Sequence, residues 1–237
     1  LSNCALFNHS FIGGGENNKA CNICATIAGG DDNLATGVES FIGAGGANKA
    51  CGNNSAVVGG CCNEALFDRS IVVGGNDNKF VSSGTMSFIG GGSSNRVNGN
   101  CGTVVGGQSN SSNKAHSFIG GGCCNLSCGL GSTVVGGKSN KFQASSDAST
   151  IGGGCDNKIN TTGDFHVIAG GCGNCINTTG NSSGVLGGIS NTVSHDNSFT
   201  IGSNLSSAAT NTTFVNNLST AGILSAGSMY DTGSRVI

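Results

Sequence analysis

The chain has 237 residues, with 44 glycines, no proline, no tryptophan, 9% charged residues and a formal net charge of −2. A charge this small implies neither nucleic acid nor an anionic membrane as a partner. Helix-forming residues are too sparse for a helical fold, and regularly placed Ile, Val and Phe argue against disorder. No apolar run approaches the roughly 20 residues that a membrane-spanning helix needs.

One motif recurs along the whole chain. With a Ser-like residue counted as position zero, position two is Ile or Val, positions four and five are Gly-Gly (once Ala44-Gly45), and position eight is Asn. A fixed register of this kind is typical of repeat proteins. In chain order the repeats begin at Ser10, Ala25, Ser40, Ser55, Ser70, Ser87, Gly102, Ser117, Ser132, Ser149, His166 and Ser183, and a degenerate one follows at Ser198.

The spacing between repeats predicts the fold. It is 15 residues, except that it is 17 after Ser70, Ser132, Ser149 and His166. Extended chain of this length makes a circuit of roughly 50 Å, enough for two short strands and two bends. We therefore predict an all-β fold, a parallel β-roll or β-solenoid of about 12 or 13 coils that stack about 4.8 Å apart. Residues 1–3 match the end of a repeat that lacks its Gly-Gly, so we expect the chain to be part of a longer one.

Two apolar columns are expected to fill the interior of the roll. Ile or Val at position two forms one column, and position ten supplies the facing column. The bulkiest residues at position ten, Phe80, Phe142, Ile159 and Ile176, all fall in 17-residue coils, so a larger side chain goes with a longer circuit. The Gly-Gly pair marks a bend that requires a positive φ or a close approach of two backbones.

The invariant Asn at position eight has two compatible explanations. Stacked amides form hydrogen-bonded ladders in arrays of identical strands. Alternatively, Asn only tolerates a left-handed turn conformation. The column consists of Asn18, Asn33, Asn48, Asn63, Asn78, Asn95, Asn110, Asn125, Asn140, Asn157, Asn174 and Asn191.

The outer faces of the two strands differ in polarity. Because side chains alternate along a strand, positions one and three point outward beside the buried position two. They are apolar, and Phe-Gly pairs alternate with small-Val pairs, as interlocking surfaces require. A strand that is apolar on both faces is buried on both faces, so we predict a homo-oligomer interface. Its residues are Phe11, Phe41, Val58, Phe88, Val105, Phe118 and Val135.

The second strand is predicted to face water or a receptor. Position nine carries a basic stripe, which is most simply a solvated face and alternatively a contact for a glycan or an anionic receptor. The stripe consists of Lys19, Lys49, Lys79, Arg96, Lys141 and Lys158.

The pattern Ser-x-Ile-Gly-Gly-Gly-x-x-Asn-x-Ala resembles the head repeats of YadA-type trimeric autotransporter adhesins, in the Gly-Gly-Gly-x-x-Asn variant of phage and viral tail fibres. The resemblance covers residues 1–202 and implies a left-handed β-roll, a homotrimer and attachment to a host surface. Residues 203–237 resemble the neck segment that follows such repeats. The expected location is extracellular, on a virion surface or tail fibre, or alternatively on a bacterial outer surface.

Thirteen cysteines are unusual for such a fold. Cys155 and Cys172 share position six in adjacent coils, a spacing within the range of a disulfide, so we predict that they are bridged. Two C-x-x-C sequences, at 21–24 and 172–175, lack the four-ligand set of a zinc site. Most cysteines are better explained as small apolar fillers, and no metal or cofactor is expected.

Nothing in the sequence assembles a catalytic site. The four histidines lie far apart, and no Ser-His-Asp set or carboxylate pair can be proposed. We therefore expect a trimeric fibre protein that attaches to a receptor or glycan on a host cell, and not an enzyme. The alternative is a purely structural shaft whose binding tip lies elsewhere. Ice binding is disfavoured, because Thr occupies position one only intermittently.

Overall fold

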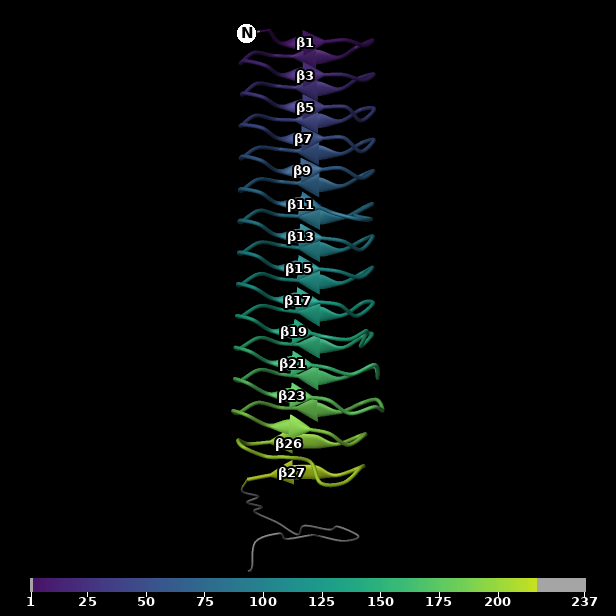
Figure 1. Ribbon diagram of the computed structural model, residues 1–237, viewed down its shortest axis with the longest axis vertical. Coiled ribbons are helices and arrows are strands. Elements are labelled where there is room, and N and C mark those ends of the chain that lie inside the picture. Colours follow the sequence, from purple (N-terminus) through teal and green to yellow (C-terminus); the bar gives the residue numbers. More distant parts are fainter. Residues whose placement is uncertain (1, 217–237) are drawn as a thin grey trace, which may run out of the picture.

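The computed structural model describes residues 2–216 and shows a parallel β-solenoid of about 14 turns (Figure 1). Each full coil contributes one two-residue strand to each of two sheets that run the length of the rod, and the last two strands of one sheet have three residues each. The first sheet has 14 strands and contains positions one and two of every coil. Its members are β2 (Phe11–Ile12), β4 (Thr26–Ile27), β6 (Phe41–Ile42), β8 (Ala56–Val57), β10 (Ile71–Val72), β12 (Phe88–Ile89), β14 (Thr103–Val104), β16 (Phe118–Ile119), β18 (Thr133–Val134), β20 (Thr150–Ile151), β22 (Val167–Ile168), β24 (Gly184–Val185), β26 (Phe199–Ile201) and β27 (Thr213–Val215).

The second sheet has 13 strands and contains positions nine and ten. Its members are β1 (Cys4–Ala5), β3 (Lys19–Ala20), β5 (Leu34–Ala35), β7 (Lys49–Ala50), β9 (Glu64–Ala65), β11 (Lys79–Phe80), β13 (Arg96–Val97), β15 (Ser111–Ser112), β17 (Leu126–Ser127), β19 (Lys141–Phe142), β21 (Lys158–Ile159), β23 (Cys175–Ile176) and β25 (Thr192–Val193).

Equivalent positions of successive coils stack directly on one another. Val104 pairs with Ile119, and Ile119 pairs with Val134, in parallel register. A third ladder of single bridges joins position six of each coil to position six of the next, for example Cys61 to Asn76. The predicted stacking of coils at 15- and 17-residue intervals is therefore confirmed.

The core consists of the two predicted columns. Position two is fully buried in every coil from Ile27 to Val185. Burial of each such side chain contributes about 1.5–3 kcal/mol to the free energy of folding. Phe80 and Phe142 are the largest fully buried side chains. Gly84 lies in the longer bend of its 17-residue coil, where a Cβ would come within 2.7 Å of the Phe80 side chain. The longer bend thus makes room for the larger ring.

Two coils place Ser instead of an apolar residue at position ten. Ser112 and Ser127 are fully buried. Their hydroxyls hydrogen-bond the hydroxyls of Ser117 and Ser132, the position-zero residues of the following coils. The polar atoms are thus satisfied inside the roll, as buried hydroxyls require.

The Gly-Gly pair has two different structural roles. Position five has a positive φ in every full coil, and at Gly107 a Cβ would lie 2.1 Å from the Gly122 carbonyl oxygen of the next coil. At position four, by contrast, Gly106 has no neighbour within 4 Å. The single Ala at position four, Ala44, is tolerated for this reason.

The Asn column forms a continuous buried ladder. In each full coil the Asn backbone N–H donates to the side-chain Oδ1 of the preceding Asn over 2.9–3.1 Å. Its Nδ2 donates to the carbonyl of Gly (once Ala44) at position four and to a Gly carbonyl of the next coil. None of the twelve Asn residues has a positive φ; the left-handed conformation falls on position seven instead, as at Ala47 and Ser109. The hydrogen bonds of the side-chain amide, and not tolerance of a left-handed turn, therefore explain why position eight is always Asn.

The last described coil departs from the repeat. β26 pairs with β27 after 14 residues, with Phe199 opposite Thr213 and Ile201 opposite Val215. Residues 217–237, which make up most of the predicted neck segment at 203–237, lie outside the described residues. The division of the chain at residue 202 therefore stays a prediction.

Candidate functional site

The outer face of the 14-stranded sheet carries most of the exposed apolar surface. Ten of the eighteen exposed large apolar side chains in residues 2–216 occupy positions one and three of this sheet. We call this face the outer wall. Its exposed members are Phe11, Phe41, Val58, Ile71, Val73, Val105, Val135, Val167, Leu186 and Ile201.

The outer wall includes more residues than the seven predicted from the sequence. Five of the seven predicted interface residues are exposed on it, from Phe41 at 39% to Phe11 at 56%, and Phe88 and Phe118 are half-buried. Ile71, Val73, Val167, Leu186 and Ile201 extend it and were not predicted. The same positions, one and three, identify them once the rule is applied to every coil.

Aromatic rings on the outer wall lie along their own strands. A Cβ added to Gly90 would be 3.2 Å from Cε1 of Phe88, and one added to Gly120 would be 3.4 Å from Cε1 of Phe118. The ring at position one therefore covers the glycine at position three. The glycine itself is required by the backbone of the next coil, because a Cβ would lie 2.3 Å from the Val105 carbonyl oxygen at Gly90 and 2.3 Å from the Val135 carbonyl oxygen at Gly120.

The basic stripe on the opposite sheet is partly neutralised. Glu64, also at position nine, lies 3.2 Å from Lys49 Nζ and 3.6 Å from Lys79 Nζ. Asp77 pairs with Lys79 at 2.8 Å and with Arg96 at 3.2 Å. The hydrogen bond from Lys79 lowers the pKa of Asp77, and the same bond raises the pKa of Lys79. The middle of the stripe is thus a network of alternating charge and not an unbroken cationic surface.

Both ends of the basic stripe keep unneutralised cations. In the described part of the chain no carboxylate lies within 4 Å of the amino groups of Lys19, Lys141 or Lys158. Lys141 and Lys158 are direct register partners on β19 and β21. The two like charges in adjacent coils repel each other, so this pair is the part of the stripe best suited to an anionic ligand.

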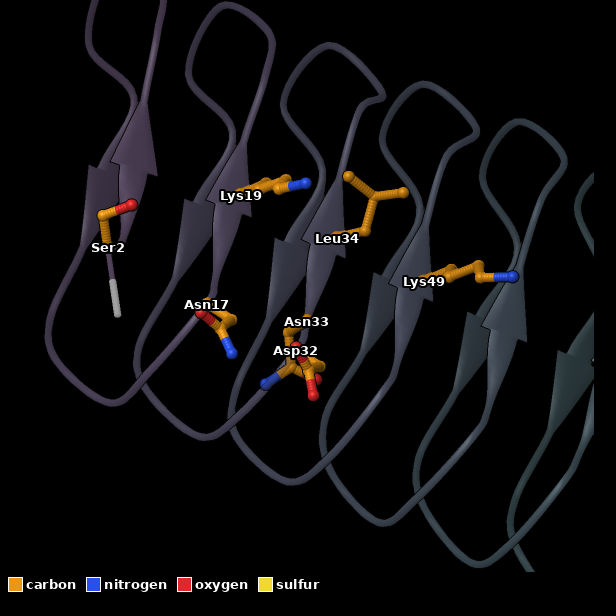
Figure 2. A pocket seen from close by; sticks show the side chains of 7 residues that line it. All are labelled: Ser2, Asn17, Lys19, Asp32, Asn33, Leu34 and Lys49. Atoms are coloured by element: carbon orange, nitrogen blue, oxygen red, sulfur yellow. The ribbon is translucent and has the colours of Figure 1, made fainter.

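A shallow groove of about 490 Å³ lies at the N-terminal end of the stripe. Figure 2 shows Lys19, Leu34 and Lys49 projecting in a row from successive coils, with Asn17 and Asp32 at the neighbouring bend. The lining mixes both charges with one apolar side chain. It presents no convergent set of polar groups of the kind that binds a small molecule.

A second polar ladder at the opposite bend was not predicted from the sequence. Two residues before position zero, a backbone N–H donates to the Oδ1 of the Asn or Asp one coil further on. Asn53 donates to Asp68 over 2.8 Å, and Asp147 donates to Asp164 over 2.9 Å. The remaining pairs are Val38 to Asn53, Thr85 to Asn100, Leu130 to Asp147, and Asp164 to Asn181.

All thirteen cysteines are free thiols in the structure. Cys155 and Cys172 form the predicted pair of adjacent position-six residues, but Cys155 Sγ donates to Asp156 Oδ2 at 3.1 Å. Their bridging stays a prediction. In the C-x-x-C sequences, burial raises the pKa of Cys21 and of Cys175, which opposes the thiolate form that a metal needs. Within residues 2–216 no group of three His, Cys, Asp or Glu side chains is arranged to hold a metal ion.

One histidine is buried in the roll. His166 replaces the usual Ser at position zero and is fully buried. Its Nδ1 accepts a hydrogen bond from the Ser183 N–H over 3.2 Å, and its Nε2 has no partner. Burial lowers the pKa of His166, because the low-dielectric interior disfavours the charged ring.

Comparison with known proteins gives no family for this chain. Neither the protein-family models nor the curated protein sequences produce a match. Among the residues that the structure describes, no helix has the length and apolar character needed to cross a bilayer. The two outer faces of the roll, apolar on one side and charged on the other, are the features from which a function can be argued.

Proposed function

We propose that the chain is the shaft and attachment surface of a homotrimeric fibre, exposed on a virion or on a bacterial outer surface. The observation that carries the proposal is the outer wall, an apolar face that runs the length of the rod. Monomeric soluble proteins rarely expose a continuous apolar face of this kind. Copies of the same chain, related by an axis parallel to the rod, would bury it.

Both the shape and the pattern of the outer wall favour a partner with the same repeat. Phe118 at position one is followed in the next coil by Thr133, and Gly120 at position three is followed by Val135. Large and small side chains therefore alternate from coil to coil, and an identical rod offers a complementary surface at the same axial spacing. The number three, the left-handed roll and the YadA-like family come from the resemblance of the Ser-x-Ile-Gly-Gly-Gly-x-x-Asn repeat to adhesin heads and viral tail fibres.

The proposed attachment surface is the basic stripe on the opposite sheet. In a trimer closed by the outer wall, this sheet would face solvent on all three sides. Lys141 and Lys158 lack carboxylate neighbours within 4 Å in the described residues, so an anionic receptor or glycan on the host cell is the ligand that fits them.

The second candidate is a structural shaft without a receptor contact of its own. It is favoured by the ion pairs that Glu64 and Asp77 form with Lys49, Lys79 and Arg96. A charge network of this kind keeps a surface soluble without creating a binding site. In that case the binding tip lies in another part of the assembled fibre.

A matched pair of substitutions tests the oligomer. Val105→Asp places a carboxylate on the outer wall, and Leu126→Asp places one on the outer face of the other sheet. An unpaired buried charge costs about 3–5 kcal/mol, so Val105→Asp should shift the sedimentation profile toward monomer while Leu126→Asp leaves the profile unchanged. Equal behaviour of the two variants would refute a partner on the outer wall.

A second matched pair separates attachment from a purely structural role. The double variant Lys141→Gln, Lys158→Gln removes the unneutralised pair, and Lys49→Gln, Lys79→Gln removes two ion-paired lysines. Retention on an immobilised sulfated polysaccharide should fall for the first variant and change little for the second. Unchanged retention for both would favour the structural shaft.

A further inference from the structure

Two pairs of adjacent cysteines occupy the same place in their coils. Cys61-Cys62 and Cys123-Cys124 stand at positions six and seven, directly after the Gly-Gly pair. In each pair the two Sγ atoms lie 2.9 Å apart. A disulfide bond is about 2.05 Å long, so closing either pair needs a further approach of only about 0.9 Å.

Neighbouring coils fix the backbone of both pairs. The Cys62 N–H donates to the Gly46 carbonyl over 2.9 Å, and the Cys61 carbonyl accepts from the Asp77 N–H over 3.0 Å. The same two bonds recur at the other pair. There the Cys124 N–H donates to Gln108 and the Cys123 carbonyl accepts from Ser139, each over 2.9 Å.

The second cysteine of each pair has the same left-handed conformation, with φ of 61° at both Cys62 and Cys124. Four backbone hydrogen bonds and a shared dihedral angle thus fix the same backbone conformation at two separate sites, and the sulfur atoms are 2.9 Å apart at both. The proximity of the thiols therefore recurs with the bend.

Each pair is accessible and has no competing thiol beside it in its own column. Cys61 and Cys124 are exposed, and Cys62 and Cys123 are half-buried. The position-six neighbours of Cys61 are Gly46 and Asn76, and those of Cys123 are Gln108 and Lys138. The nearest reaction partner along the bend is therefore the adjacent cysteine.

We propose that Cys61-Cys62 and Cys123-Cys124 are two-electron redox sites, each interconverting between a dithiol and a vicinal disulfide ring by exchange with a small-molecule disulfide. The thiolate of one cysteine attacks a sulfur of the oxidant R–S–S–R, forms a mixed disulfide and releases one R–S⁻. The neighbouring cysteine then attacks the protein sulfur of that mixed disulfide and releases the second R–S⁻.

The exchange is balanced. The products are one protein disulfide and two R–SH, and the protein loses two electrons and two protons to the oxidant. The ring joins adjacent residues, so closing it constrains almost no length of unfolded chain and adds little stability. The site is a reversible switch and not a structural staple.

Mass spectrometry of the full chain tests this directly. The folded protein is incubated in a buffer of oxidised and reduced glutathione, quenched with an alkylating reagent and digested with thermolysin. This protease cleaves before Val and Leu, and so separates Cys51 and Cys128 from the two pairs. Peptides that contain Cys61-Cys62 or Cys123-Cys124 should be lighter by two hydrogen atoms and carry no alkyl group. After reduction with dithiothreitol each should take up two alkyl groups.

Three variants serve as controls. Cys62→Ser should abolish the light form of its own peptide and leave that of Cys123-Cys124 unchanged, and Cys124→Ser should do the reverse. Cys155→Ser should affect neither. The yield of each ring should also be about tenfold higher in the folded protein than in guanidinium at the same glutathione ratio, because the bend holds the sulfurs together.

Three results would overturn the proposal. The first is alkylation or glutathionylation of both cysteines of a pair in the folded protein. The second is a cross-link from either pair to a different peptide. The third is an equal ring yield in folded and unfolded protein, which would show that the bend does not build the site.

Discussion

The side-chain Oδ1 of Asn110 accepts a hydrogen bond of 3.0 Å from the backbone N–H of Asn125, one coil further along the rod. The same Asn110 donates from Nδ2 to the carbonyls of Gly106 at 2.9 Å and Gly122 at 3.0 Å. One buried amide therefore fixes the bend of its own coil and the spacing to the next.

Replacing Asn110 with Ala should destabilise the coils on either side of it. The change leaves a buried N–H and a buried carbonyl without their partner, and each such group costs about 1–3 kcal/mol. We expect a loss of about 3 kcal/mol in local stability, measured as faster hydrogen exchange of the Asn125 amide.

The control for this variant is the adjacent residue. Ser109→Ala changes position seven of the same bend, where Ala47 stands in another coil with the same positive φ. It should leave the exchange of Asn125 nearly unchanged. If Asn110→Ala and Ser109→Ala have the same effect, the amide ladder does not stabilise the roll.

The two glycines of one Gly-Gly pair should differ sharply in their tolerance of Ala. At Gly107 the φ is 86°, and a Cβ would lie 2.1 Å from the Gly122 carbonyl oxygen. At Gly106 the space is open. We expect Gly107→Ala to cost about 3 kcal/mol or more and Gly106→Ala about 0.5 kcal/mol or less, measured by guanidinium unfolding. A reversed order would contradict the described bend.

The buried His166 should make the roll less stable in acid. Its pKa is lowered in the folded state by burial, so the unfolded chain takes up the proton at a higher pH than the folded one. The contribution of neutral His166 to the free energy of unfolding is thus fully present above the histidine pKa of about 6.5 in the unfolded chain. It falls as the pH drops below that value. Asp164 and Asp196 lie near the ring and oppose the shift, but burial is the larger effect.

Replacing His166 with Ser, the usual residue at position zero, should remove much of this sensitivity. The thermal midpoint of the variant should change less between pH 8 and pH 5 than that of the unmodified protein. His116→Ser, at an exposed histidine, should keep the full change. Equal acid sensitivity of the unmodified protein and His166→Ser would show that His166 is not responsible.

The stacking of coils could be predicted from the sequence because each residue type that the stacking needs recurs at the same position of the repeat. Ile119 can only be buried beside Val104 and Val134 if the coils stack in register. The outer wall followed from the same argument. The second ladder did not, because the position that forms it is not invariant and holds Val38 or Leu130 in some coils. Only the accepting coil needs Asn or Asp, and Val38 or Leu130 can donate equally well.

Two other features depend on distances that residue type alone does not supply. The basic stripe was predicted from the cations at position nine, whereas Glu64 at the same position and Asp77 two residues before Lys79 neutralise half of it. The approach of Cys61 to Cys62 depends on the left-handed φ at position seven. The repeat pattern does not reveal that conformation, because position seven accepts many residue types.

The most direct test of the proposed fibre is the mass of the native particle, measured by sedimentation equilibrium without denaturant and over a wide range of concentration. Closure of the outer wall by identical chains predicts a single species with three times the 23.1 kDa mass of the chain. A single species of 23.1 kDa, with Phe11, Val105 and Val135 left in water, would contradict it.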